Sequence, residues 1–245
     1  MKDSGYVLLY SELFLKFGLR EFSVGDVVER FDGRFGGTPI NIMLQRLYEK
    51  GYLDRVGRGV YRVVHPYVYI LNRVGGGWRE RIDPRYRLLV DVLVSGLVDL
   101  FMDRLVSIVL FGSLARGSVH RFSDVDLLVI ADGLPKKYGL RVKMLKPILD
   151  KLAPYRIKLW RQHGIYPNID IIILDRAEGT VNHPFYLDLV TDAVIIYDRD
   201  GFIENRIRRL REKLLEIGAI KVERPDGRYY WVLKPGLRWG EVLEL

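Results

Sequence analysis

Three short aliphatic runs constrain the fold of this chain more than any other feature of its sequence. They occupy residues 107–111 (SIVLF), 127–130 (LLVI) and 168–174 (NIDIIIL). Each run is rich in β-branched residues and is bounded by polar or turn residues, which is the pattern of a buried strand. The runs therefore predict a sheet with an apolar interior. The polar residues beside them become the candidates for chemistry.

Two aspartates stand close together just before the second run. Asp124 and Asp126 are two positions apart, so in a strand their side chains project from the same face. Two carboxylates beside an apolar strand repel each other and lose solvation unless positive charge lies between them. A divalent cation such as Mg²⁺ or Mn²⁺ supplies that charge and prefers oxygen ligands. The alternative is a turn capped by one aspartate while the other is exposed, which accounts for most isolated pairs of this spacing.

Polar residues also accompany the other two runs. Gly112-Ser113 directly follows the first run, where Gly permits close approach of the backbone and free N–H groups can receive a phosphate. Alone, such a pair is more often an ordinary turn. Asp170 lies inside the third run, and a carboxylate among aliphatic residues is costly to bury without a partner. We expect it to complete a three-carboxylate cluster, the alternative being an exposed position on a strand edge.

The run LFGSLARGSVHRFSDVDLLVI closely resembles the signature of the DNA polymerase beta-like nucleotidyltransferase superfamily, in its minimal nucleotidyltransferase branch. That signature is Gly-Ser, two residues, Arg-Gly, five residues, then Ser-Asp-x-Asp-Leu. The match keeps the family spacing throughout, and the compatible region runs from about residue 84 to 200 and onward. The matching positions are Gly112, Ser113, Arg116, Gly117, Ser123, Asp124, Asp126 and Leu127.

The resemblance implies a fold and a reaction. The fold is an α+β domain over residues 84–245, with a mixed sheet flanked by helices. The reaction is transfer of a nucleoside monophosphate from an NTP to a hydroxyl acceptor, with release of pyrophosphate. Asp124 and Asp126 would bind two Mg²⁺ ions, with Mn²⁺ as a substitute. Asp170 would ligate one ion and help to deprotonate the acceptor.

The resemblance also assigns the nucleotide contacts. Gly112 and Ser113 would hold the β- and γ-phosphates of the incoming NTP. Arg116 lies one helical turn after Ser113, where it either contacts phosphate or supports the scaffold.

The first part of the chain predicts a separate domain over residues 1–75. Apolar periodicity indicates helices at 5–17 and 24–31, and Ser23 is suited to cap the second of them. Thr38-Pro39 indicates the start of a third helix, which ends at Gly51. Two short strands around Gly57-Arg58-Gly59 then read as a hairpin. The order resembles a winged helix-turn-helix domain over about residues 5–66, carried by GTPINIMLQRLYEKGYLDRVGRGVYRV.

By analogy with that family, the third helix would enter a DNA groove and the hairpin would touch the DNA backbone. The residues expected to contact bases are Asn41, Gln45 and Arg46, and those expected near phosphate are Arg55, Arg58 and Arg62. Asp26 and Glu29 would oppose DNA. Because winged helices also bind proteins, DNA and protein both stay possible partners of this domain.

Residues 74–84, with three consecutive glycines, predict a linker before the second domain.

Charge is concentrated in one stretch. Residues 133–163 hold nine Lys and Arg against the single acid Asp150, so this stretch carries the whole net charge of +8. A concentrated basic face favours an anionic partner, a triphosphate or a nucleic acid, although a solvated helix explains it almost as well. Because the stretch lies between the two acid-bearing strands, an RNA acceptor is attractive. A protein hydroxyl or a small molecule stays open.

Composition excludes other kinds of site. The chain has no cysteine, which excludes disulfides, zinc-thiolate sites and cysteine nucleophiles. It has four histidines, none of them paired four residues apart, which argues against a metal site built of histidines. Its N-terminus lacks the pattern of a signal peptide, and no run is long and apolar enough to cross a membrane, so we expect a cytoplasmic protein. The oligomeric state cannot be read from these patterns.

Two further interpretations concern the C-terminal part and the function as a whole. The aromatic stretch 228–233 could stack on bases, but a strand packed on the core fits its pattern better. The competing function is a non-catalytic regulator, in which the winged helix binds DNA and the transferase domain senses nucleotide. Membership of a toxin–antitoxin pair is a further family-level alternative.

Overall fold

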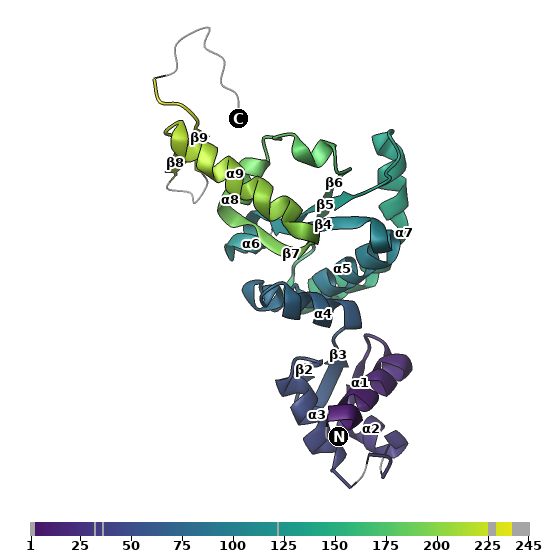
Figure 1. Ribbon diagram of the computed structural model, residues 1–245. Helices are drawn as coiled ribbons and strands as arrows, with labels where there is room; N and C mark the ends of the chain where they lie inside the picture. The colour runs from purple at the N-terminus through teal and green to yellow at the C-terminus, as the bar shows by residue number, and fades with distance from the viewer. Residues whose placement is uncertain (1–2, 32, 36, 122, 225–228, 237–245) are drawn as a thin grey trace. The chain divides into compact units, whose positions relative to one another are not determined.

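The computed structural model describes residues 3–31, 33–35, 37–121, 123–224 and 229–236. The chain divides into two compact units, Met1–Val74 and Gly75–Leu245 (Figure 1). Each unit has its own sheet and its own hydrophobic core. Among the described helices, none has the length and apolar character needed to cross a bilayer.

The first unit consists of helices around a small antiparallel sheet. The helices are α1 (Asp3–Phe17), α2 (Val24–Phe31), α3 (Ile40–Glu49) and α4 (Pro66–Val74), and the strands are β1 (Glu21–Ser23), β2 (Leu53–Gly57) and β3 (Val60–Val63). The strand order is β1-β3-β2. The helices at α1–α3 and the hairpin β2–β3 match the sequence prediction, whereas β1 and α4 were not predicted.

Local signals place the helix starts of this unit. The Ser23 hydroxyl accepts from the Asp26 N–H at 3.2 Å, and the Asp26 carboxylate accepts from the Ser23 N–H at 2.7 Å. This reciprocal pair satisfies two backbone donors at the start of α2. Pro39 stands at the N-cap of α3 in extended conformation. Leu9, Leu13 and other apolar residues of the helices meet the inner face of the sheet in one core.

The second unit is built on a four-stranded sheet. Its strands are β4 (Leu105–Phe111), β5 (Val125–Ala131), β6 (Ile169–Leu174) and β7 (Val194–Asp198), with a separate hairpin of β8 (Ile220–Glu223) and β9 (Tyr229–Val232). The order is β6-β5-β4-β7, in which β5 and β6 are parallel and the other pairs antiparallel. The expected mixed sheet is therefore confirmed. The three predicted runs are three adjacent strands.

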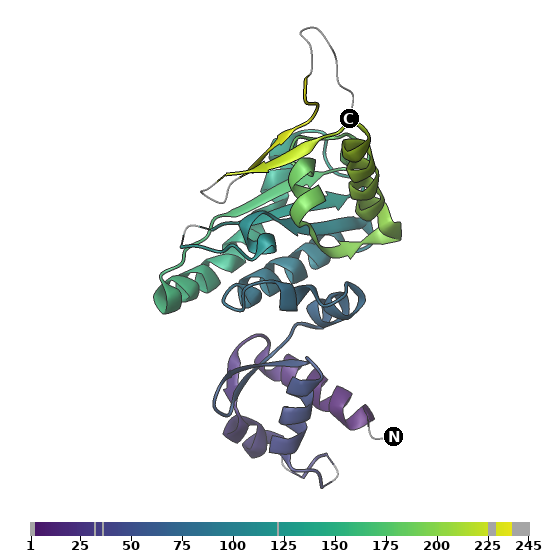
Figure 2. The ribbon, with the colours of Figure 1, turned by 90° about the vertical axis from the view of Figure 1, so that its left-hand side faces the viewer.

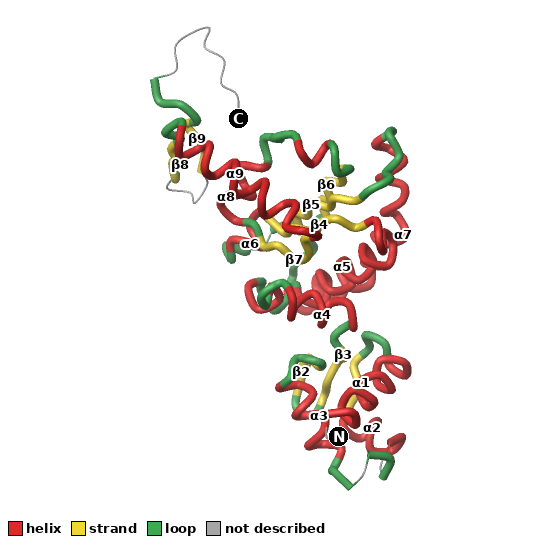
Figure 3. Tube along the Cα trace, in the orientation of Figure 1, coloured by secondary structure: helices red, strands yellow, loops and turns green. Residues whose placement is uncertain are grey.

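Helices cover the two faces of this sheet, shown in yellow in Figure 3. The longer helices are α5 (Arg87–Phe101), α7 (Tyr138–His163) and α9 (Phe202–Glu216), and the shorter ones α6 (Gly112–Arg116) and α8 (Tyr186–Asp192); short 3-10 turns lie at Trp78–Arg81, Met102–Arg104, Glu178–Thr180 and Arg199–Gly201. α5 and α7 pack together on one face, while α8 and α9 pack on the other (Figure 2). Gly96 of α5 permits this close approach, because a Cβ there would lie 3.0 Å from Ile148 of α7.

The segment that the sequence suggests as a linker makes specific contacts in the second unit. Trp78 is fully buried, and the next residue, Arg79, is 5% exposed. The Arg79 guanidinium donates to both carboxylate oxygens of Asp91 on α5, at 2.9 and 2.8 Å. A paired, bidentate geometry is what makes a buried charge tolerable. These contacts fix residues 78–81 on α5.

Candidate active site

The turn between β4 and α6 brings backbone and carboxylate into contact. Gly112 begins α6 with φ of 72°, a conformation that L side chains rarely adopt. A Cβ at this position would lie 2.2 Å from Oδ2 of Asp126, so there is no room for one. Phe111, the preceding residue, pairs directly with Asp126 across the antiparallel β4–β5 ladder. Glycine at position 112 therefore lets the Asp126 carboxylate rest on the turn.

The parallel pairing of β5 and β6 sets two acids side by side. Asp126 is in register with Asp170 of β6. Residues in register on neighbouring strands point to the same face, so the two carboxylates share one face of the sheet. β6 is an edge strand, and Asp170 is exposed. Asp170 thus has the exposed edge position of the alternative interpretation and also stands in register with Asp126, while the three-carboxylate cluster stays a prediction.

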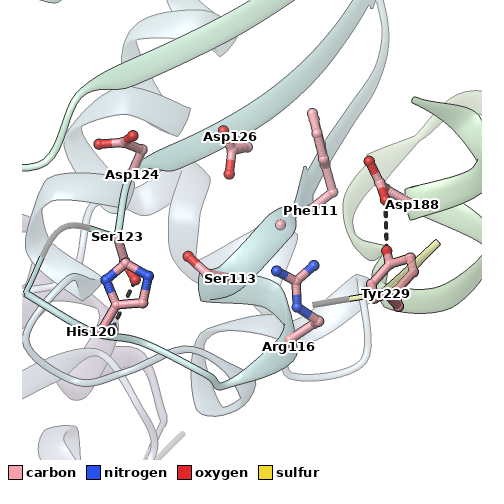
Figure 4. Close-up of a pocket in the computed structure, with 10 residues that line it drawn as sticks. Phe111, Ser113, Arg116, His120, Ser123, Asp124, Asp126, Asp188 and Tyr229 are labelled. Carbon is pink, nitrogen blue, oxygen red and sulfur yellow. Dashed lines mark hydrogen bonds between the residues drawn. The ribbon is translucent and has the colours of Figure 1, made fainter. Parts of the chain in front are cut away.

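Asp124 lies just before β5 with its carboxylate engaged by the backbone. Its Oδ1 accepts a hydrogen bond from the Asn168 N–H at 2.8 Å. In Figure 4 the carboxylates of Asp124 and Asp126 point in different directions. Within the part of the chain that the structure describes, no three His, Asp or Glu side chains form a ready-made metal cage.

Electrostatics single out Asp126. Burial raises the pKa of Asp126 to about 6, and the nearby charges of Asp170 and Asp124 add to the rise, while Arg116 opposes it. Carboxylates that disfavour one another's ionised form are typical of sites that hold a cation or handle a proton. The donor set is oxygen only, which suits a hard divalent cation such as Mg²⁺.

The loop between the two halves of the motif is held by Ser123. Its hydroxyl accepts from the His120 N–H at 2.8 Å, and its own N–H donates to the His120 carbonyl at 3.0 Å. The buried hydroxyl of Tyr86 donates to the Ser123 carbonyl at 3.2 Å. The buried serine of the motif therefore shapes the turn that leads into Asp124.

These elements surround a pocket of about 480 Å³. Figure 4 shows side chains from both halves of the motif around it. The residues that line it are Phe111, Gly112, Ser113, Arg116, His120, Ser123, Asp124, Asp126, Asp188 and Tyr229. Of the residues expected at the site, all but Asp170 line this pocket, and Asp170 lies beside it through its pairing with Asp126.

Sequence reasoning missed Asp188 of α8 and Tyr229 of β9 as residues of this pocket. Tyr229 belongs to the aromatic stretch that was expected to pack on the core, and Trp231 and Leu233 do pack there. Tyr229 and Trp231 lie on the same face of β9, because side chains alternate along a strand, so strand alternation does not separate Tyr229 from the residues that pack on the core. Arg228, the first residue of that stretch, lies outside the described residues.

The residues expected to contact DNA form no comparable site. On α3, Asn41, Gln45 and Arg46 line a surface depression, but Gln45 donates to Glu49 at 2.9 Å and Arg46 donates to the Tyr6 hydroxyl. Of the hairpin arginines, Arg55 and Arg58 are exposed. Arg62 is 9% exposed and ion-paired with Glu21 at 3.2 Å.

Most of the basic stretch forms one long helix, α7, and its first two lysines, Lys136 and Lys137, precede that helix. Arg141 is buried and forms an ion pair with Glu178. Most of the other lysines and arginines of α7 are exposed, and so is Trp160, at 57%. Near its C-terminal end, the guanidinium of Arg156 lies 4.1 Å above the ring of Tyr166. Since α7 leads directly into β6, this basic and aromatic end precedes the strand that carries Asp170.

Two sequence comparisons identify relatives of the second unit. Residues 93–179 match the family described as Nucleotidyltransferase domain. The chain is also 34% identical over 137 residues to a Methanocaldococcus jannaschii protein named "Putative protein adenylyltransferase", a match that covers 55% of this chain and 87% of that protein.

Structural comparison finds more distant similarity. A crystal structure of a toxin–antitoxin with AMP-PNP is 19% identical, with 51% of this chain and 90% of that chain covered and a TM-score of 0.32. A crystal structure of a Sulfolobus solfataricus protein is 23% identical, with coverages of 51% and 88% and a TM-score of 0.29. At these TM-scores we base no argument on the structural likeness. The sequence matches suffice: this chain belongs to the nucleotidyltransferase domain family and is a nucleotidyltransferase.

Proposed function

We propose that this chain transfers the AMP moiety of ATP to a hydroxyl group of a protein, with release of pyrophosphate. The observation that carries the proposal is the pocket that unites Gly112 and Ser113 with Asp124 and Asp126. ATP as donor and protein as acceptor follow from the name of the Methanocaldococcus relative, which shares 34% of its residues with this chain over 87% of its own length.

The roles of the residues follow from their places around the pocket. The triphosphate lies along Gly112 and Ser113, where the backbone can approach closely because no Cβ intervenes. The acceptor oxygen attacks the α-phosphorus, the bond from that phosphorus to the bridging oxygen of pyrophosphate breaks, and the proton of the acceptor passes to Asp170. Asp170 suits this role because it is exposed and stands in register with Asp126.

A divalent cation fits the chemistry of the acids. Asp124, Asp126 and Asp170 offer only oxygen ligands, and the pKa of Asp126 is raised by burial first and then by the charges of Asp170 and Asp124, both of which a bound cation would offset. One oxygen of Asp124 is used by the Asn168 N–H, which leaves the other for a cation. Bound at these acids, two Mg²⁺ ions, or Mn²⁺ in their place, would stabilise the attacking and leaving oxygens of an in-line displacement.

RNA is the second candidate acceptor, and the surface of α7 favours it. Exposed lysines and arginines occur on α7 with the exposed Trp160 and the Arg156–Tyr166 stack. Basic side chains with interleaved aromatic rings are the usual means of binding single-stranded nucleic acid. The position of this surface next to the strand of Asp170 would bring a terminal ribose hydroxyl within reach of the acids.

We propose that the first unit is a winged helix that recruits a partner. Its support is three helices followed by a hairpin whose tip carries Arg58, with a third strand, β1, beside β3. A DNA partner would meet exposed Arg55 and Arg58, whereas Arg46 and Arg62 would first have to leave Tyr6 and Glu21. A regulator that binds DNA and senses nucleotide without turnover is the competing function.

The decisive experiment uses NTPs that carry a label on the α-phosphate. The full-length protein with Mg²⁺ is incubated with each NTP and with cellular protein, with cellular RNA, or with neither. Label from ATP in a protein band, absent with Asp126→Asn, is the expected result. Label in RNA would select the second candidate. Binding of NTP and DNA without label transfer to any acceptor would contradict the proposal and favour the regulator.

A further inference from the structure

The pocket has a second wall that lies outside the residues matched by the family. The match ends at residue 179, whereas Asp188 and Asp192 belong to α8 and Tyr229 belongs to β9. We call Asp188 and Tyr229, which line the pocket, together with Asp192, which contacts Tyr229 and Arg116, the C-terminal wall, and Gly112, Ser113, Asp124 and Asp126 the motif wall. Figure 4 shows Arg116 between Ser113 of the motif wall and Tyr229 of the C-terminal wall. Nothing in the family motif accounts for the C-terminal wall.

Hydrogen bonds connect the C-terminal wall to Arg116. The Tyr229 hydroxyl donates to Oδ1 of Asp188 at 2.6 Å and lies 3.2 Å from Oδ2 of Asp192. The same Oδ2 accepts from Nη1 of Arg116 at 2.7 Å. The guanidinium also stands over the Tyr229 ring, with 5.7 Å from its central carbon to the ring centroid. Arg116 is thus held by a carboxylate and by an aromatic face.

Asp192 is much more deeply buried than Arg116, which indicates that the carboxylate orients the guanidinium. The Asp192 side chain is 6% exposed, whereas the Arg116 side chain is 32% exposed. A carboxylate so buried needs a charged partner, and Arg116 supplies it while part of the guanidinium still faces the pocket. Burial, followed by hydrogen bonding to Asp188, raises the pKa of Tyr229, so its hydroxyl stays protonated and remains a donor.

Charge in the pocket makes the orientation of Arg116 important. Among the described lining residues, Arg116 is the only lysine or arginine, while Asp124, Asp126 and Asp188 are acids. A triphosphate entering such a pocket needs every positive group aimed at it. A guanidinium presents its donors in a rigid plane, and one fixed donor therefore sets the direction of the rest.

We propose that Asp192 and Tyr229 are positioning residues that hold Arg116 against the phosphates of a nucleoside triphosphate, so that the C-terminal hairpin completes the nucleotide site. This inference rests on the proposed function, because it assumes that a nucleotide occupies the pocket. It assigns nucleotide affinity to Asp192 and Tyr229, which lie beyond the matched region.

The test is the affinity of the full-length protein for an ATP analogue with a methylene bridge between the α- and β-phosphates, measured by calorimetry with Mg²⁺. Tyr229→Phe keeps the ring and removes the hydroxyl, and Asp192→Asn keeps the shape and removes the charge. Each should weaken binding roughly tenfold, as expected for a hydrogen bond to a charged group. The two changes combined should weaken binding by less than the product of the single effects, because both act through Arg116.

Controls separate positioning from folding. Tyr230→Phe changes the neighbouring, exposed tyrosine of β9 and should bind the analogue like the wild type. Asp192→Glu, which restores the charge, should recover most of the lost affinity, and the thermal midpoints should change little. In label transfer, Asp192→Asn should raise KM for the nucleotide more than it lowers kcat.

The outcomes distinguish this inference from the proposed function. Tyr229→Phe and Asp192→Asn variants that bind the analogue as tightly as Tyr230→Phe would overturn the positioning role. Wild-type protein that binds the analogue, loses affinity in both variants and yet transfers no label would contradict the proposed function and support the C-terminal wall. Wild-type protein that binds no analogue would overturn both.

Discussion

The two walls of the pocket are built in opposite ways. The motif wall comes from residues close together in the chain, Gly112 and Ser113 of α6 and Asp124 and Asp126 around the start of β5, and the ladder of β4 and β5 fixes Gly112 against Asp126. The C-terminal wall is assembled from α8 and β9. Its hydrogen bonds join Tyr229 to residues 41 and 37 positions earlier in the chain.

This difference predicts a division of labour. Short-range backbone geometry holds the motif wall rigidly, which suits groups that must meet reacting atoms with little error. Side-chain hydrogen bonds between distant segments hold the C-terminal wall, and such contacts tune affinity more readily than they form a reactive centre. We therefore expect changes in the motif wall to abolish transfer and changes in the C-terminal wall to weaken nucleotide binding.

The largest effect is expected at Asp126. Asp126→Asn removes a charge that the proposed mechanism needs for binding cations, and loss of several kcal/mol of electrostatic stabilisation lowers the rate of transfer by about 10³-fold. Label transfer from ATP under saturating nucleotide measures the change.

The matched control for Asp126 lies at the other end of the same strand. Asp132→Asn makes the same chemical change directly after β5, where Asp132 pairs with Arg176 at 3.0 Å. Transfer by this variant should stay within about twofold of the wild type, because surface ion pairs contribute about 1 kcal/mol or less. Substantial transfer by Asp126→Asn would mean that Asp126 is not needed for the reaction, and the proposed difference in role between the two walls would be wrong.

The next effect tests the contact between backbone and carboxylate. Gly112→Ala places a methyl group where Asp126 Oδ2 stands, and residue 112 also needs positive φ. We expect transfer to fall by about 10²-fold, the loss typical of a displacement of about 1 Å at a reacting centre.

Gly117 provides a control with the same backbone conformation. Both glycines have φ of 72°, but a Cβ at Gly117 would meet no heavy atom within 4 Å. Gly117→Ala should therefore lose only about 1–2 kcal/mol of unfolding free energy, with transfer near the wild-type rate. Equal losses of transfer in the two variants would mean that backbone strain, and not the contact with Asp126, explains glycine at 112.

The sequence was informative where one local pattern decides the structure. The aliphatic runs at 107–111, 127–130 and 168–174 are all strands, as their shortness and β-branched residues indicate; β4 and β5 are buried, whereas the edge strand β6 is only partly buried. The spacing of Asp124 and Asp126 predicted two acids on one strand face, whereas Asp124 precedes β5 and the two carboxylates point in different directions (Figure 4). The family motif identifies the enzyme. These features depend on neighbours in the chain, so a sequence displays them directly.

The sequence was silent where distant segments decide. β1 has only three residues and exists because Glu21, Phe22 and Ser23 pair with β3. Tyr229 lines the pocket because the β8–β9 hairpin brings its hydroxyl to α8. Neither arrangement leaves a periodic signal. Asp170 shows the intermediate case, since its strand was predicted but its partner in register, Asp126, follows only from the parallel pairing.

A smaller effect concerns the pH dependence of stability in metal-free protein. Burial and neighbouring acids raise the pKa of Asp126 from 3.8 to about 6 in the folded state. Its ionised form therefore opposes folding above about pH 6, and this penalty disappears as the pH falls toward 4. Asp126→Asn should be more stable than the wild type by about 1–3 kcal/mol at neutral pH, and the difference should shrink on acidification.

Asp132→Asn should show the opposite sign. Hydrogen bonds from Arg176 lower the pKa of Asp132, so its contribution to stability is present at neutral pH and is lost as the pH falls. Guanidinium unfolding with a chelator, repeated from about pH 4 to about pH 7, compares the two variants. Parallel pH profiles for the two variants would contradict the electrostatic difference between the ends of β5.

The smallest effects are expected at two buried tyrosines, each of which supports one of the two walls. The Tyr86 hydroxyl donates to the Ser123 carbonyl at 3.2 Å and supports the motif wall. The Tyr186 hydroxyl donates to the Gly179 carbonyl at 2.8 Å and anchors α8, which carries Asp188 and Asp192. Phenylalanine at either position should lower the unfolding free energy by about 0.5–1.5 kcal/mol.

The kinetic effects of these two variants should differ although their stabilities match. Tyr86→Phe loosens the turn that leads into Asp124, so kcat should fall two- to fivefold, roughly the effect of a small misplacement, with little change in KM for ATP. Tyr186→Phe loosens α8 and with it the partner of Arg116, so KM should rise by a similar factor while kcat stays constant. If both variants changed the same kinetic constant, the two walls would act as one unit, and the division between chemistry and nucleotide affinity would not hold.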